Sequence, residues 1–449
     1  MIGPSSATRL AARAIAVLVA IVVAPVHAQQ PPQRTTRGSR AFDRLFLQDD
    51  QASPGSLTVS GYQGHDTVTE EIPAIGEVPV QSGGLFSGLS ASAALVKNRR
   101  KTGFLLESGA AMRRYTASGH MTMFGHATGE MRYGGRRLGV RSRVLGAYAP
   151  YYQFLPVLNS ATSRVEDVSG RAQDLAATDR TLTTLSSVTD LGRQLSRDTM
   201  LSGAYTLRFT HYGSTSGAIQ PLSDVVGHEG TVRLTHQFGK YTSLFGGYGI
   251  RYSSRPAVTA QPLRTHDLDV GVERQQQLRF SRRSTFSFRT GSTIVQVQDG
   301  HRFIFTGSGM LQHALSRYWT TSLEGRRAVL YVEGLTQPVL VDGLTGTAQG
   351  PIGSHFDFMV WGGYSKGDVG LSAQTANSTY QVFSGSTRLR AMLTSRLGVY
   401  GEWTQYRQLQ GHGAGLPEAL SHVVNRQGWR TGVIVQMPIQ TQKTERGAR

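Results

Sequence analysis

Two carboxylates on one face of a short polar stretch are the first candidates for chemistry. In residues 266–269, with the sequence HDLD, Asp267 and Asp269 are two positions apart, so in a strand their side chains point the same way. Such a pair can hold a metal ion or act as an acid and a base. The interpretation we favour is that they are hydrated carboxylates balancing nearby arginines. We therefore expect no metal site and no cofactor.

A possible nucleophile, Ser365, lies in the sequence GYSKG, which matches the Gly-x-Ser-x-Gly pattern of hydrolases. That pattern is functional at a strand–turn–helix corner, whereas here an alternating pattern runs into a polar loop. His120 and His126 lie six residues apart, about 20 Å along a strand, which is too far for one metal. His412 stands by itself in a glycine-rich stretch. The sequence thus predicts no catalytic residue, and we expect that the protein is not an enzyme.

Arginines recur on the polar face of segments whose other face is apolar. Arg233, for example, alternates with Val232 and Leu234. A wall of guanidinium groups attracts anions, so these side chains are candidates to line a basic pore. The predicted pore-lining residues are Arg132, Arg141, Arg143, Arg208, Arg233, Arg289, Arg388, Arg390 and Arg430.

The elements that would position these arginines are long strands. From about Ser56 onward, apolar and polar residues alternate with a period of two, which indicates strands with one apolar face. About eighteen such runs follow, among them 56–64, 102–115, 379–392 and 426–438. Soluble strands average about 5–6 residues and membrane-crossing strands need about 9–11, and most of these runs are longer still. We predict an all-β fold, a closed antiparallel transmembrane β-barrel of about eighteen strands.

The connections between these runs alternate between short basic turns and long loops such as 65–83, 151–179 and 409–425. Short periplasmic turns and longer external loops are typical of bacterial outer-membrane barrels. Similar basic turns also recur roughly every 40 residues, which fits a hairpin of two long strands. A propeller blade has a similar period of about 40–45 residues but divides it among four short strands, so we favour the barrel.

The ends of the chain differ in composition from the alternating part. Residues 1–28 combine Arg9 and Arg13, an apolar run and the sequence VHA, which are the marks of a secretory signal peptide. Residues 29–55 read as a flexible N-terminal arm, residues 56–438 as the barrel, and residues 439–449 as a C-terminal tail. The export signal and the absence of any long apolar stretch in the rest of the chain predict an exported protein that is either soluble or built of membrane-crossing strands.

Composition supports the same interpretation. The 449 residues include 53 glycines and no cysteine, which excludes disulfide scaffolds and Cys-ligated metals. The formal net charge of +18 raises the possibility of nucleic-acid binding. The positive residues are dispersed through turns and alternating faces and do not cluster with aromatics, so we expect no nucleic-acid partner.

The architecture of residues 56–438 resembles the general outer-membrane porins. In those proteins the third external loop commonly folds inward and narrows the channel. The resemblance implies that the longest loop, 151–179, is the constriction loop here. Its acids Glu166, Asp167 and Asp174 would then face wall arginines. The repeated Leu-Ser-Arg turns also look like those of uncharacterised porin-like barrels associated with exopolysaccharide export.

The sequence therefore supports three functions at the bacterial outer membrane. The first is a porin-like channel for small hydrophilic, preferentially anionic solutes. The alternative is a barrel for export or assembly of a surface polysaccharide, and the third choice is an outer-membrane hydrolase. A soluble secreted β-protein remains the structural alternative. The expected partners are outer-membrane lipid and lipopolysaccharide, the barrel-assembly machinery, and small solutes or polysaccharide.

Overall fold

The computed structural model describes most of the alternating part of the chain. The described residues are 55–71, 84–98, 101–117, 119, 121–149, 181–213, 224–239, 241–254, 263–278, 281–297, 300–316, 318–330, 339–369, 379–410 and 423–438. The chain divides into two units, Met1–Arg37 and Gly38–Arg449, and every described residue belongs to the second. The predicted signal peptide, the C-terminal tail and all of the arm except Gly55 lie outside the described residues.

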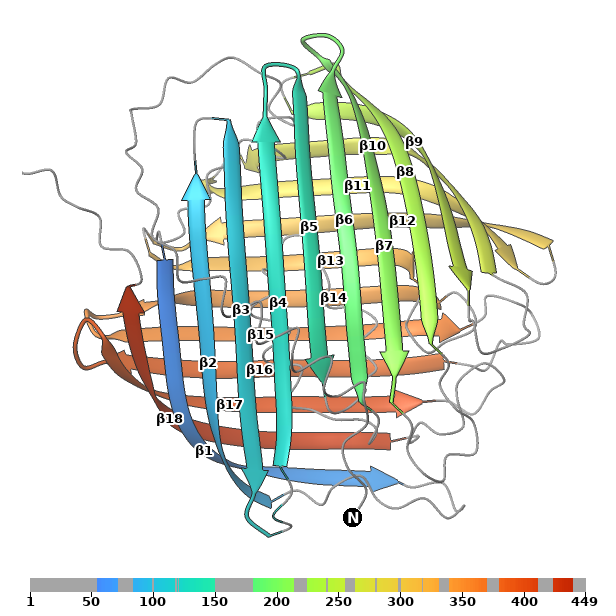
Figure 1. Cartoon of the computed structure of the whole chain (residues 1–449). Coiled ribbons are helices and arrows are strands. Elements are labelled where there is room, and N and C mark those ends of the chain that lie inside the picture. The colour runs from blue at the N-terminus through green and yellow to red at the C-terminus, as the bar shows by residue number, and fades with distance from the viewer. Residues whose placement is uncertain are drawn as a thin grey trace, which may run out of the picture. The chain divides into compact units, whose positions relative to one another are not determined.

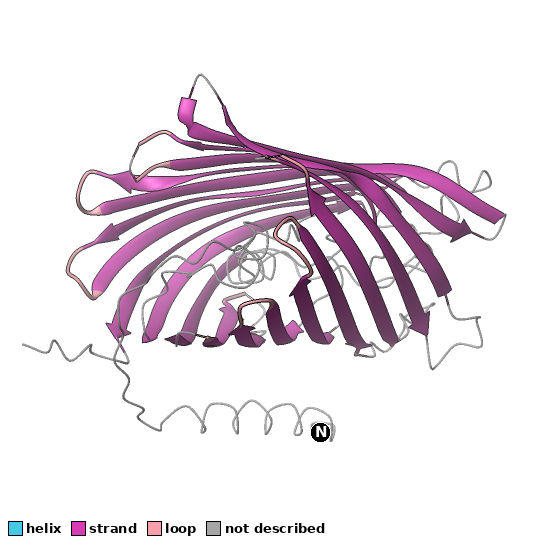
Figure 2. Cartoon of the chain, turned by 90° about the horizontal axis from the view of Figure 1, so that it is seen from above, coloured by secondary structure: helices cyan, strands magenta, loops and turns pink. Residues whose placement is uncertain are grey.

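Eighteen β-strands make up the described elements, and Figure 2 shows them as one curved sheet joined by turns. The strands are β1 (Gly55–Glu71), β2 (Gly84–Asn98), β3 (Thr102–Tyr115), β4 (Met121–Gly134), β5 (Leu138–Ala149), β6 (Leu182–Gln194), β7 (Thr199–Tyr212), β8 (Val225–Gln237), β9 (Thr242–Ser254), β10 (Leu263–Leu278), β11 (Ser281–Val297), β12 (Gly300–Ala314), β13 (Thr320–Leu330), β14 (Val339–Ile352), β15 (Phe356–Val369), β16 (Thr379–Met392), β17 (Leu397–Gln410) and β18 (Val423–Pro438). Within the described ranges, no helix is long and apolar enough to cross a membrane.

Each strand pairs antiparallel with the strands before and after it in the chain. The first strand, β1, also pairs with the last, β18, with Ser56 opposite Pro438 and Glu71 opposite Val423. This pairing closes the sheet and removes both of its edges. Figure 1 shows β3–β7 crossing in front of β13–β17, as expected for strands tilted in a barrel wall. The predicted fold class is confirmed, and a propeller or a soluble sandwich is excluded.

The two ends of the barrel differ in how the strands are connected. At one end, which we call the turn rim, strands are joined by short segments such as 135–137, 195–198 and 353–355. At the other end, the loop rim, the connections include 72–83, 150–181 and 411–422. The start of β1 and the end of β18 are opposite each other in the register, and both lie at the turn rim. An even strand number with this arrangement is typical of bacterial outer-membrane barrels.

A hydroxyl at the start of several turns accounts for the internal repeat. The Oγ of Ser196 accepts hydrogen bonds from the backbone N–H groups of Asp198 (3.3 Å) and Thr199 (3.1 Å). Thr394 accepts the equivalent pair through Oγ1, from the second and third residues after it, at 3.2 and 2.9 Å. Ser316 does the same further along the rim. The repeated sequence is thus a local turn device, because the hydroxyl satisfies two amides that the tight turn leaves unpaired.

The outer face of the barrel is apolar. Large hydrophobic side chains such as Leu207, Phe209 and Val232 are exposed on alternate positions, while their chain neighbours point the other way. Trp403 and Trp429 are directly opposite each other on β17 and β18, 44% and 49% exposed. Each is the seventh residue of its strand, so this pair lies well inside the wall.

Candidate functional site

The nine arginines predicted to line a pore all share the inner face of the wall. On β16 the exposed Leu389 points outward, so Arg388 and Arg390 on either side of it point inward. The same alternation places the other seven on the inner face, namely Arg132, Arg141, Arg143, Arg208, Arg233, Arg289 and Arg430. The strands therefore bring all of the predicted arginines to one surface of the sheet.

At least six of these nine arginines lie within ion-pair distance of a carboxylate, and for Arg141, Arg143, Arg390 and Arg430 that carboxylate is on the adjacent strand. Arg430 donates to Glu402 at 2.8 Å, and Arg390 donates to Asp357 at 2.6 Å. The inner wall therefore supplies its own acids, a feature that the sequence analysis assigned to the constriction loop. Loop 151–179, with Glu166, Asp167 and Asp174, lies outside the described residues.

The densest group of charges, which we call the Glu130 cluster, lies on β4 and β5. The Glu130 side chain is 4% exposed and accepts hydrogen bonds from Arg141 at 2.8 and 2.9 Å and from Arg143 at 2.9 Å. The Nε of Arg132 lies 3.6 Å from the same carboxylate. Three arginines and one glutamate sum to a net charge of +2 (3 − 1), and Asp190, opposite Arg141 on β6, lowers this to +1 (2 − 1). Because the Glu130 carboxylate is buried and charge-assisted bonds are strong, it holds these guanidinium groups in fixed positions.

The hairpin register explains how the Glu130 cluster forms. Glu130 is directly opposite Arg143 in the β4–β5 pair, and Arg132 is opposite Arg141. Directly opposite residues on one face lie about 4.5–5.5 Å apart at Cβ, within reach of a salt bridge. The turn at 135–137 fixes this register. Once the turn between the two strands is located, the sequence is therefore sufficient to predict which residues of this cluster are opposite each other.

A second group, the Asp66 cluster, fills the inner wall at the loop rim. Asp66 accepts hydrogen bonds from the hydroxyl of Tyr115 at 2.9 Å and from the backbone N–H of Gly84 at 3.0 Å. Arg113 donates to the Tyr115 hydroxyl at 3.2 Å and lies over the Phe86 ring at 4.2 Å. The acid, the arginine and both rings are buried. The cluster joins β1, β2 and β3, and its residues show no shared pattern in the sequence by which it could have been predicted.

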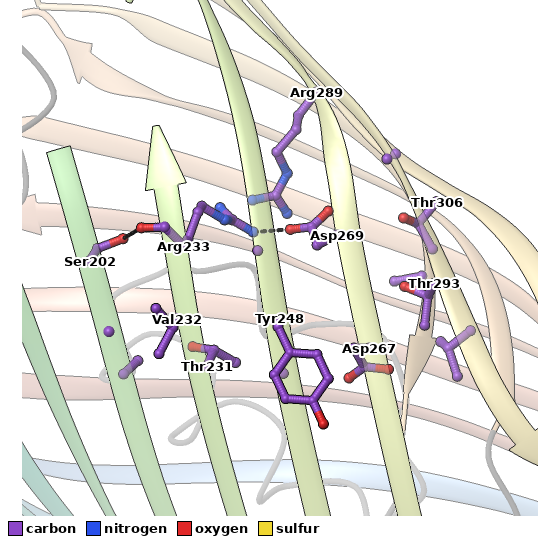
Figure 3. A pocket seen from close by; sticks show the side chains of 18 of the residues that line it. Ser202, Thr231, Val232, Arg233, Tyr248, Asp267, Asp269, Arg289, Thr293 and Thr306 are labelled. Carbon is purple, nitrogen blue, oxygen red and sulfur yellow. Dashed lines mark hydrogen bonds and ion pairs between the residues drawn. The ribbon is translucent and has the colours of Figure 1, made fainter. Parts of the chain in front are cut away.

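The third region is a hollow of about 400 Å³ in the wall formed by β6–β13, which we call the β6–β13 hollow. Figure 3 shows Arg233 and Asp269 joined across it. Between them in the strand register lies Gly247, opposite both residues. A side chain at that position would start 3.4 Å from the Cβ of Arg233, so the glycine lets the arginine reach across a whole strand.

Aromatic and small residues complete the β6–β13 hollow. The guanidinium groups of Arg233 and Arg289 lie 4.8 and 6.0 Å from the ring of Phe245, within the range of cation–π attraction. At Gly249 an added Cβ would lie 3.3 Å from Thr231 and 3.4 Å from the Cβ of the aspartate at position 267. The floor of the hollow is therefore backbone, and the charged groups stand around it.

The candidate catalytic residues do not form a reactive site. Ser365 is buried and lies inside β15, which continues through Gly367, so the strand–turn–helix corner of a hydrolase is not formed there. His126 lies on the inner face of β4, whereas His120 and His412 lie outside the described residues. Within the described ranges, no three His, Asp or Glu side chains are grouped so that they could hold a metal ion.

Comparison with known proteins gives structural likeness only. No family model matches the sequence, and no curated protein matches it. OpdQ of Pseudomonas aeruginosa is 9% identical with a TM-score of 0.41, covering 86% of this chain and 98% of its own. OccK2 (OpdF) of the same organism, in complex with glucuronate, is 13% identical with a TM-score of 0.42, at coverages of 86% and 98%. OccAB4 of Acinetobacter baumannii is 10% identical with a TM-score of 0.39, at 86% and 99%.

Because similarity at this level is low, the class of protein is defined by the barrel itself. The sheet closes through β1 and β18, its strands alternate between an apolar outer face and a charged inner face, and its two rims differ in loop length. In a bilayer only a closed sheet leaves no unpaired backbone at an edge. These features together are those of a β-barrel of the bacterial outer membrane.

Proposed function

We propose that the barrel is a passive porin-like channel for small hydrophilic solutes, with a preference for anions. The observation that supports the channel is a closed sheet of eighteen strands whose inner face bears charged side chains. Barrels of about 16–18 strands are wide enough to enclose an aqueous channel. Charged side chains on the inner face favour a water-filled interior, because burying charges away from water costs free energy.

The anion preference is supported by the Glu130 cluster. The side chains of Arg141 and Arg143 are 29% and 35% exposed, so part of each guanidinium group is open to the barrel interior. Glu130 orders them, and Glu130 and Asp190 together offset two of the three positive charges, so one positive charge remains. A fixed excess of positive charge in a narrow, partly desolvated space raises the local anion concentration.

We further propose that loop 151–179 narrows this channel. It is part of the longest connection, between β5 and β6, and so begins directly after the strand that carries Arg141 and Arg143. Its acids, at positions 166, 167 and 174, would limit the positive field to one side of the passage. Deletion of residues 155–175 should then raise single-channel conductance without loss of the barrel.

Ion selectivity in planar lipid bilayers tests the proposal. We expect the full chain to give stable conductance steps and a reversal potential under a KCl gradient that indicates anion preference. The double variant Arg141→Gln/Arg143→Gln should lose most of that preference, because it removes two of the three positive charges. Lys366→Gln, a change at an exposed position on the outer face of β15, is the matched control and should keep it.

Two outcomes would count against the channel. A barrel that never conducts, although its heat-dependent gel mobility shows that it is folded, would contradict passive transport. A barrel that conducts only after deletion of residues 29–55 would instead favour the alternative predicted from sequence, export of a surface polysaccharide. Cation preference in the full chain would contradict the role of the arginines.

The partners that this function needs follow from the surfaces. The exposed hydrophobic side chains of the outer face would contact outer-membrane lipid and lipopolysaccharide. The barrel-assembly machinery would be required to close β1 onto β18 in the membrane. Small solutes would be the remaining partners.

A further inference from the structure

Three charged side chains that line the β6–β13 hollow have no hydrogen-bond or ion-pair partner in the described strands. These are Asp267, Arg289 and Arg326. Arg233 and Asp269, by contrast, satisfy each other. For the three side chains without a partner, partial burial removes some of their hydration, and the attraction of Arg251 for Asp267 and of Asp269 and Glu273 for Arg289 replaces only part of it, without a hydrogen bond. They are therefore ready to bind a ligand that supplies the missing charges.

The balance of charge separates this hollow from the Glu130 cluster. Its inner-face arginines are Arg233, Arg289 and Arg326, and its inner-face aspartates are Asp190, Asp267 and Asp269. Their formal charges cancel (3 − 3 = 0), whereas the Glu130 cluster, when Asp190 is counted there as well, keeps an excess of one. A simple anion gains little from a neutral group of charges, so the hollow suits a ligand that itself carries both signs.

The positions of the charges set the length of that ligand. Figure 3 shows the guanidinium group of Arg289 beside the Arg233–Asp269 pair, with Asp267 further along the same strand. Asp267 and Asp269 are two residues apart on β10, which corresponds to roughly 7 Å. The free positive and negative groups are thus separated by about the span of two extended residues.

We propose that the β6–β13 hollow is a binding site for a short zwitterionic peptide of two or three residues. The α-ammonium group of the peptide would bind Asp267, and its carboxylate would bind Arg289 and Arg326. The backbone floor at Gly247 and Gly249 leaves room for the chain between these ends. A volume of about 400 Å³ lies within the range of small-ligand sites. The inference rests on the proposed channel, for which it names a class of solute.

A neutral sugar would fit this site less well. Hydroxyl groups can hydrogen-bond to the carboxylate and the guanidinium groups, but they leave both charges uncompensated in a partly buried place. Charge-assisted bonds are roughly twice as strong as neutral ones. A free amino acid carries both charges, but they are too close together to reach both ends of the hollow.

Peptide titration with matched probes is the experiment. Trialanine with free termini is added to the full chain in planar bilayers, and the interruption of the ion current gives its dissociation constant. N-acetyl-trialanine amide, which has the same length and no charge, is the control probe, and alanine is the short zwitterion. Calorimetry on the detergent-solubilised barrel measures binding without any need for conductance.

We expect trialanine to bind at least about tenfold more tightly than either control probe, since each loses a charge-assisted contact. Asp267→Asn and Arg289→Gln should each weaken trialanine binding by about tenfold or more, while Lys366→Gln leaves it unchanged. Gly249→Val should abolish it by filling the floor. Unchanged channel conductance and heat-dependent gel mobility in Asp267→Asn would show that the barrel is intact.

The outcomes distinguish this inference from the proposed function. Equal binding of trialanine and its capped control, or no effect of Asp267→Asn and Arg289→Gln, would overturn the peptide site and leave the channel standing. Calorimetric binding without any conductance would overturn the channel and keep the site. Tighter binding of N-acetyl-trialanine, which carries only the carboxylate, would show an anion site and would also overturn the inference.

Discussion

The Asp66 cluster and the β6–β13 hollow both contain arginine and aspartate side chains, but these are buried in the first and partly exposed in the second. In the Asp66 cluster, Arg113 and Asp66 are buried and share the Tyr115 hydroxyl among aromatic rings. In the hollow, Arg289 and Asp267 stand apart above a glycine floor without an ion-pair partner in the described strands. The difference lies in the residues between the charges. Large aromatic side chains enclose the charges and exclude water, whereas glycines leave open space beside them.

Charged residues of the inner wall thus have two roles: some stabilise the contacts between strands, and others are accessible to a solute. A fully buried charge is tolerated only when it is paired and hydrogen-bonded, so the Asp66 cluster holds strands together. A partly exposed charge keeps part of its hydration and contributes little to stability, so it is available to a solute. Substitutions in the two regions should therefore differ in their effect on the free energy of unfolding.

The largest expected effect is that of Asp66→Ala. It removes the acceptor of the Tyr115 and Gly84 hydrogen bonds and the carboxylate that lies near the buried guanidinium groups of Arg113 and Arg426. Loss of one partner from a buried ion pair costs about 3–5 kcal/mol. Urea titration of the barrel in detergent, followed by tryptophan fluorescence, measures the change. A loss below about 1 kcal/mol, the level of an exposed pair, would contradict the structural role of this cluster.

An intermediate effect is expected at Gly271, a glycine on the inner face of β10 that the side chain of Phe245 approaches. A Cβ at Gly271 would collide with the backbone oxygen of Thr290 and lie 2.8 Å from Phe245, so Gly271→Ala forces the wall to move. Such overpacking costs about 1–3 kcal/mol. Gly246→Ala, on the neighbouring strand with nothing within 4 Å of the added methyl group, is the matched control. Equal unfolding curves for the two variants would show that the inner wall at Gly271 is not closely packed.

The smallest effect should come from Asp269→Asn. The side chains of Arg233 and Asp269 are 33% and 27% exposed, so their ion pair is screened by water. Its loss should lower the free energy of unfolding by only about 0–1 kcal/mol, measured in the same urea titration. A loss as large as that of Asp66→Ala would remove the distinction between the two regions.

The strands themselves could be predicted from sequence to within a few residues. The runs 102–115 and 379–392 coincide with β3 and β16. The alternation is visible because one face of each strand meets lipid and the other meets water. The first strand is longer than the run 56–64, since β1 continues to Glu71 through polar residues, where the outward positions no longer need to be apolar.

For the inner wall, some contacts could be predicted from the sequence and others could not. Alternation places all nine predicted arginines on the inner face, since the side-chain period of a strand is two. Contacts between adjacent strands, such as Glu130 with Arg143, follow from the hairpin turn and were within reach of the sequence. The contact of Arg233 with Asp269 could not be predicted from the sequence, because the two residues lie on strands separated by β9 and meet only over Gly247.

By itself the sequence determined that the chain forms about eighteen long antiparallel strands, which face is apolar, and that the inner face carries arginines. These properties are local, because they depend on the alternation along each strand and on the turn that follows it. Only the tertiary structure decided the register in which β18 pairs with β1, that aromatic side chains enclose Asp66, and that glycines open a hollow between Asp267 and Arg289. These depend on which strands become neighbours around the wall and on the space between their side chains, and no single segment contains that information.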